Sequence, residues 1–204
     1  MGRLARVVSY VLHPLWVPLI VLGLLWAADP WLRMQPAVMV YVASVLLINA
    51  LAPAVSLYVL HRRGVLGDME VSNRAERTLP FLIVLFYQTL GYFALTRPGV
   101  YLPPELLGMV VTMMAALVLA LVVNRFIKMS MHMLANGGGL GALWAFNQLH
   151  GLGLDGWLPL GFAVAGIVGW SRMAMGVHTL RELGLGFFVG FAMMRAVIES
   201  GWSP

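Results

Sequence analysis

Seven long apolar stretches, separated by short segments that hold most of the charged residues, constrain the fold of this chain most strongly. They cover residues 7–28, 34–60, 78–96, 106–124, 129–149, 156–170 and 183–202. A helix of roughly 20 apolar residues can cross a bilayer. An open strand cannot satisfy its backbone hydrogen bonds in lipid. The sequence therefore predicts an all-α fold, a polytopic transmembrane helix bundle of six or seven spans.

The composition excludes a soluble domain. Apolar residues make up 61% of the 204 residues and charged residues only 10%, whereas soluble proteins average roughly 45–50% and about 25%. We expect residues 1–204 to form a single integral membrane domain, a multi-pass protein of the cell (inner) membrane. Since the loops are short, any chemistry must lie at the ends of the helices.

The reactive side chains available to this protein are few. The chain has no cysteine, which leaves histidine and carboxylate as candidate catalytic or metal-ligating groups. Its formal net charge of +5 indicates contact with anionic lipid headgroups, and we expect no nucleic-acid partner. The oligomeric state is not encoded in any pattern that we recognise.

Most candidate functional residues are predicted to meet on one face of the membrane. With seven spans, the segments that follow the second, fourth and sixth stretches all emerge on the same side. These segments contain Arg74 and Arg77; Arg125, Lys128, Ser130 and His132; and Arg172, His178 and Glu182. The spacing of His178 and Glu182 places them on one helix face, where the carboxylate can bond one ring nitrogen and leave the other to react.

This set of residues is suited to a phosphate group. Fixed Arg and Lys donors stabilise the negative charge of a transferring phosphoryl group where water is partly excluded. A neutral imidazole can attack phosphorus, while a second histidine protonates the departing oxygen. The sequence thus predicts a phosphate site that requires no metal and no cofactor.

The string Ser171-Arg172-x5-His178-x3-Glu182 resembles the third signature of the type-2 phosphatidic acid phosphatase superfamily, in which Asp stands where this chain has Glu. Residues 128–132 resemble a diverged second signature, and Arg74, Arg77 and Pro80 echo the first. The resemblance implies a membrane lipid phosphatase that hydrolyses a lipid phosphate or pyrophosphate through a phosphohistidine intermediate.

The resemblance also implies a role for each site residue. His178 is expected to be the nucleophile, Glu182 its orienting partner and His132 the general acid. The phosphate ligands implied are Arg172, Ser130, Lys128 and one or both of Arg77 and Arg74, with Arg125 as a substitute.

Two other functions fit the same residues. The first is a non-catalytic phospholipid-binding or transport protein that holds a phosphate headgroup without hydrolysing it. The second is an intramembrane metalloenzyme that uses His132, His178 and Glu182. The glycines at positions 137, 138, 139 and 141 are expected to permit close helix packing, and His13 is a candidate for headgroup contact.

Pro14 and Pro18 lie near the start of the first stretch and predict a kink there, because proline interrupts helical hydrogen bonding. If this stretch is re-entrant, Arg3 and Arg6 lie on the side opposite the site. The remaining cations then favour an outward-facing site under the positive-inside rule, as the family resemblance also implies. We accordingly expect six spans, an outward site and a cytoplasmic N-terminus.

Overall fold

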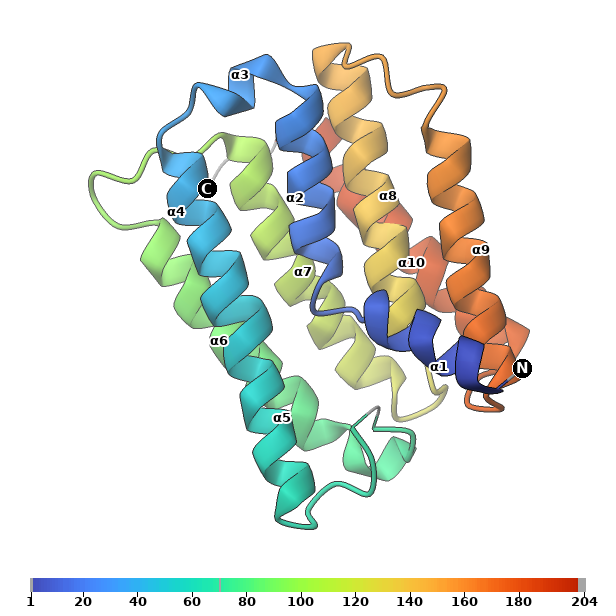
Figure 1. Ribbon diagram of the computed structural model, residues 1–204. Coiled ribbons are helices and arrows are strands. Elements are labelled where there is room, and N and C mark those ends of the chain that lie inside the picture. The colour runs from blue at the N-terminus through green and yellow to red at the C-terminus, as the bar shows by residue number, and fades with distance from the viewer. Residues whose placement is uncertain (1, 70, 202–204) are drawn as a thin grey trace.

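The computed structural model describes residues 2–69 and 71–201, and in this part of the chain every regular element is a helix (Figure 1). Trp202, the predicted end of the seventh stretch, lies outside the described residues. The elements are α1 (Gly2–Val11), α2 (Val17–Ala28), α3 (Pro30–Arg33), α4 (Ala37–Ser44), the π-helix η1 (Val45–Leu51), α5 (Ala52–Arg62), the 3₁₀-helix η2 (Arg74–Glu76), α6 (Thr78–Leu95), α7 (Pro104–Val123), α8 (Met131–His150), α9 (Leu158–Ala174) and α10 (Leu180–Glu199).

The all-α prediction is confirmed for the described residues, and several of the helices are apolar enough to be compatible with a membrane. Three helical segments are long and apolar enough to cross a membrane: Ala37–Arg62, Arg74–Leu95 and Pro104–Val123. The helices α2 and α9 are also apolar, but they have only 12 and 17 residues. Six or seven crossings were expected, and length and composition identify three.

The first stretch is broken, as its prolines predict. Helix α1 ends at Val11, and α2 begins at Val17 beyond Pro14. The Ser9 hydroxyl on α1 accepts a hydrogen bond from Arg172, so α1 lies at the end of the bundle that holds the predicted site. Oδ2 of Asp29, just after α2, lies 4.0 Å from Nδ1 of His150, which ends α8 at the opposite end of the bundle from the site. Thus α1 lies at the site end of the bundle and α2 ends at the opposite end, so the expected placement of α1 opposite the site is wrong.

Helices α8 and α10 pack so closely that only glycine fits between them. A Cβ atom built at Gly137 or Gly141 would lie less than 3.0 Å from a backbone carbonyl oxygen of α10. The same holds for Gly186 and Gly190 against the carbonyl oxygens of Ser130 and Leu134. Without a hydrophobic driving force in lipid, such close backbone approach is a main source of helix association. The predicted packing role of these α8 glycines is confirmed.

This contact makes α8 the central helix of the bundle, with α10, α9, α7 and α2 around it (Figure 1). The main core combines apolar side chains of α2 and α8 with those of the neighbouring helices, among them Leu25, Val45, Val110 and Phe146. Both the start of α8 and the start of α10 lie at the same end of the bundle, because Ser130 N–H donates to Glu182 O at 3.2 Å. The site is built around that end.

Replacing Gly190 tests the close contact of α8 and α10. In Gly190→Ala the new methyl group meets the Leu134 carbonyl oxygen, and overpacking of this kind costs about 1–3 kcal/mol. Gly184→Ala is the matched control on the same helix, because a Cβ there has nothing within 4 Å. We expect thermal unfolding in detergent to show a lower midpoint for Gly190→Ala and an unchanged or higher one for Gly184→Ala. Equal midpoints would contradict the contact.

Candidate active site

His178 lies in the turn between α9 and α10, one residue before the N-cap of α10. Thr179 and Glu182 form a capping box, in which Glu182 Oε2 accepts from Thr179 N–H at 3.0 Å. The same oxygen lies 3.1 Å from Nδ1 of His178. The predicted pair of His178 and Glu182 therefore forms, but the capping geometry brings the two residues together rather than a shared helix face. The carboxylate fixes the proton on Nδ1 and leaves a lone pair on Nε2.

Arg77 contacts that remaining nitrogen. Its guanidinium is buried, with Nη2 at 3.4 Å from His178 Nε2, Nη1 donating to Met129 O at 2.9 Å and Nε donating to Val71 O at 3.1 Å. Arginine has only donors, so Nε2 is the acceptor. Arg77 thus joins three loops and places a fixed positive charge beside the candidate nucleophile.

The surroundings of His178 keep its imidazole neutral. Burial, together with the charge of the Arg77 guanidinium, lowers the pKa of His178 from 6.5 to about 4, although the hydrogen bond to Glu182 acts in the opposite direction. Near pH 7 the ring therefore carries no proton on Nε2. A nucleophilic imidazole must be in this form.

Arg172 and His132 face the same cavity through a contact with α1. Arg172 Nη1 donates to the Ser9 hydroxyl at 2.6 Å, and His132 Nε2 lies 3.2 Å from both the Oγ and the carbonyl oxygen of Ser9. A carbonyl can only accept, so the proton of His132 is on Nε2. The His13 ring meets the His132 ring edge-on, with centroids 5.3 Å apart.

Ser9 was not recognised in the sequence. A single serine on a short helix with exposed Arg3 and Arg6 carries no motif, and its partners lie more than 120 residues away. The buried position of Ser9, on the same helix as buried Ala5, becomes visible only once α1 is packed against α9.

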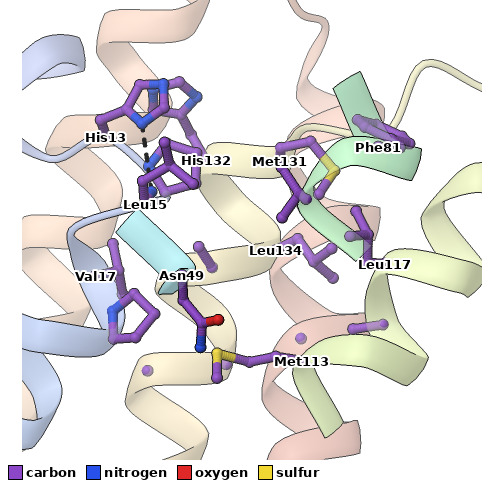
Figure 2. Close-up of a pocket in the computed structure, with 18 of the residues that line it drawn as sticks. His13, Leu15, Val17, Asn49, Phe81, Met113, Leu117, Met131, His132 and Leu134 are labelled. Atoms are coloured by element: carbon purple, nitrogen blue, oxygen red, sulfur yellow. Dashed lines mark hydrogen bonds between the residues drawn. The ribbon is translucent and has the colours of Figure 1, made fainter. Parts of the chain in front are cut away.

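The cavity has a volume of about 190 Å³ and is lined by Arg77, His132, Arg172 and His178 among mostly apolar side chains. Figure 2 shows His13 and His132 at one side of it, with apolar residues of several helices opposite. The predicted convergence of the loops on one end of the bundle is confirmed by these contacts. Four of the eight predicted site residues line the cavity, and Glu182 supports it from behind His178.

The other three predicted site residues make structural contacts. The Ser130 hydroxyl caps α8, accepting from Met133 N–H at 3.4 Å, and is fully buried. Lys128 Nζ donates to Val177 O at 2.9 Å, next to His178 in the chain. Burial and the nearby Arg77 lower the pKa of Lys128. Exposed Arg74 donates to the carbonyl oxygens of Arg125 and Phe126, away from the cavity.

Arg125, the substitute phosphate ligand, is exposed and does not line the cavity. Among residues 2–69 and 71–201, no three histidine, cysteine or carboxylate side chains are grouped to hold a metal ion. His132 accordingly does not form a three-ligand cluster with His178 and Glu182. The alternative of an intramembrane metalloenzyme with these three ligands has no geometric support.

Comparisons with known proteins give no family for this chain. No family model matches it, and neither a curated protein nor a solved structure does so.

Proposed function

We propose that this protein is a metal-independent membrane lipid phosphatase that resembles the type-2 phosphatidic acid phosphatases. One observation carries the proposal: His178 has Nδ1 held by Glu182 and Nε2 turned to a buried arginine, in a cavity that Arg172 and His132 also line. A histidine packed for stability alone does not need two buried guanidiniums nearby, since charges at membrane depth are costly.

In the first step, the lone pair on His178 Nε2 attacks the phosphorus of a bound lipid phosphate. The N–P bond forms as the bond between phosphorus and the lipid oxygen breaks. Arg77 and Arg172 stabilise the charge on the phosphoryl oxygens, and Glu182 stabilises the positive charge that the ring acquires. The lipid phosphate binds as a monoanion and gives its proton to His132, whose imidazolium form the remaining negative charge of the phosphate favours. His132 transfers one proton to the departing oxygen, so the lipid leaves as an alcohol.

In the second step, His132 is neutral and accepts a proton from a water molecule that attacks the phosphohistidine. The new O–P bond replaces the N–P bond, and the electron pair returns to Nε2 of His178. Inorganic phosphate then leaves with the proton that His132 accepted, so His132 is neutral again before the next lipid phosphate binds. Ser9 has a positioning role here, because its contacts hold Arg172 and His132 together.

Three further residues of the predicted site have supporting roles in this proposal. Ser130 caps α8 and Lys128 binds the backbone before His178, so both hold the loops that carry the reactive groups. Lys128 can exchange its carbonyl partner for a phosphate oxygen at the rim. Arg74 fixes the loop after α7 through backbone carbonyls.

Removing either histidine tests the enzymatic proposal. We expect His178→Ala and His132→Ala to lose phosphate release from lipid phosphates by at least about a hundredfold, the usual range for acid–base groups. His61→Ala is the matched control, because the His61 ring bonds the Leu66 carbonyl outside the cavity. Activity should also survive EDTA. The measurement is phosphate release by the detergent-purified protein from a panel of lipid phosphates and pyrophosphates.

Lipid binding without phosphate release in the unmodified protein would contradict the enzyme and favour the phospholipid-binding or transport alternative. Activity lost on chelation and restored by zinc would contradict metal independence. Full activity in His178→Ala would contradict the phosphohistidine step.

We further propose seven crossings, with α2 and α9 as the short ones, and a site at the cytoplasmic face. The cations at the site end that do not belong to the site are Arg3, Arg6, Arg62, Arg63, Arg125 and Arg181, and those at the other end are Arg33, Arg97 and Arg195. The positive-inside rule therefore favours a cytoplasmic site end. The charge argument for an outward site depended on α1 lying at the other end.

Cysteine labelling tests this orientation, since the chain has no native thiol. Gly2→Cys and Gly67→Cys add a side chain without a clash, and both positions lie at the site end. We expect an impermeant maleimide added to intact cells to leave both unlabelled, but to label Tyr101→Cys in the exposed loop between α6 and α7. Labelling of Gly2→Cys and Gly67→Cys without Tyr101→Cys would place the site outside.

A further inference from the structure

The cavity does not end at the histidines and arginines. It continues between the helices, and its lining includes Asn49, Gln88, Met109, Thr112 and Met113. We call this part the inner chamber. Figure 2 shows the Asn49 side chain among the apolar residues of the cavity, with Met113 next to it in the view. Apart from Asn49, Gln88 and Thr112, the chamber is apolar, and the phosphate chemistry described above does not use it.

Asn49 has buried hydrogen-bonding atoms that are not satisfied. The residue is only 5% exposed, and neither Oδ1 nor Nδ2 has a hydrogen-bond partner among the described residues. It lies in η1, where Ala52 N–H donates to Leu47 O five residues back. Pro53 has no N–H to offer the Asn49 carbonyl in an α-helical register, which explains why the helix widens here. Such π segments occur often at functional sites.

Gln88 adds a second unsatisfied group to the same chamber. The residue is 9% exposed, and its Oε1 has no hydrogen-bond partner within the part of the chain that the structure describes. Gln88 and Gly91 lie three residues apart on one face of α6. A Cβ at Gly91 would lie 3.2 Å from Asn49 Oδ1, so α6 brings Gln88 to the side of η1 that carries Asn49.

A polar ligand in the chamber accounts for these atoms. Leaving a buried donor or acceptor unmade costs about 1–3 kcal/mol, and the bilayer core supplies no water to the outside of the bundle. The unsatisfied atoms of the cavity-lining residues Asn49 and Gln88 comprise one amide NH2 donor and two carbonyl acceptors. A hydroxyl group matches it, because it both donates and accepts. The remaining lining of Met109, Met113 and similar side chains matches an aliphatic chain.

We propose that the inner chamber binds the aliphatic chain of a lipid that carries a hydroxyl group partway along, which hydrogen-bonds to Asn49 and Gln88. Because the chamber is continuous with the cavity of His178, the chain belongs to the lipid whose phosphate lies at that histidine. This last link rests on the proposed phosphatase function. The binding of the hydroxylated chain does not.

Phosphate-free probes test the chamber by itself. Methyl stearate and a series of methyl hydroxystearates, with the hydroxyl moved carbon by carbon, are competed against a fluorescent fatty ester on the detergent-purified protein. We expect at least one hydroxylated ester to bind roughly tenfold more tightly than methyl stearate. Asn49→Leu and Gln88→Leu should each reduce that preference, and removing an unsatisfied polar group should not lower the midpoint of unfolding.

Tyr41→Phe is the matched control. Tyr41 is a buried residue of α4 whose hydroxyl has no partner among the described residues, but it does not line the cavity. It should keep the preference for the hydroxylated ester. If no hydroxylated ester binds more tightly, or if the preference is the same in Asn49→Leu and Gln88→Leu, the chamber holds water only and the proposal is overturned.

A second assay separates this proposal from the phosphatase. Phosphate release is compared for stearoyl and hydroxystearoyl lysophosphatidic acids with the hydroxyl at the preferred carbon. A hydroxyl preference in ester binding with no phosphate release from any lipid phosphate would contradict the phosphatase and support the chamber. Phosphate release without any preference in ester binding would overturn the chamber and support the phosphatase.

Discussion

The contact between α8 and α10 is the constraint on which the site depends. Glycines on both helices let backbone meet backbone, and this fixes the relative position of the two helices to within small displacements. The start of α10 is thereby held against the start of α8, where Ser130 N–H reaches Glu182 O. His178 lies four residues before Glu182 in the chain, and His132 lies two residues after Ser130. The two histidines assigned opposite roles in phosphoryl transfer thus lie at adjoining helix starts, with His132 in the first turn of α8 and His178 in the turn just before α10.

The electrostatic properties of the site follow from the burial of two arginines. Arg77 and Arg172 are almost entirely removed from solvent, and the Arg77 guanidinium donates to one backbone carbonyl of its own loop and to one of the loop before α8. Backbone carbonyls spread partial charge without neutralising the guanidinium, so Arg77 keeps its attraction for an anion. Burial, together with the positive charge of Arg77, keeps His178 neutral. For the phosphatase that we propose, an uncharged imidazole beside fixed cations is an arrangement that exists before the phosphate binds, which is the condition for large electrostatic stabilisation of a transition state.

Much of this arrangement could be predicted from the sequence, for identifiable reasons. Apolar stretches between charges predicted the helices because bilayer thickness imposes a length on them. The pairing of Glu182 with His178 and the packing role of Gly137 and Gly141 also followed from short-range spacing. The sequence could not show which of Arg74 and Arg77 reaches the cavity. That choice depends on the 3₁₀ turn η2, which leaves Arg74 exposed and is followed by buried Arg77. Neither Ser9 nor Asn49 belongs to a local sequence motif. Ser9 matters because it contacts Arg172 and His132, which are distant in the chain. Asn49 matters because it lines a cavity between helices. The side on which α1 lies was mispredicted, because prolines indicate a break without giving the direction after it.

Trapping the covalent intermediate tests the central claim most directly. Purified protein is mixed with a lipid phosphate labelled in its phosphoryl group, quenched in alkali during turnover, and digested for mass spectrometry. The account predicts an acid-labile, base-stable phosphate on His178, which disappears in His178→Ala. Continued turnover with phosphate on another residue, or with no phosphate on the protein at any quench time, would contradict it.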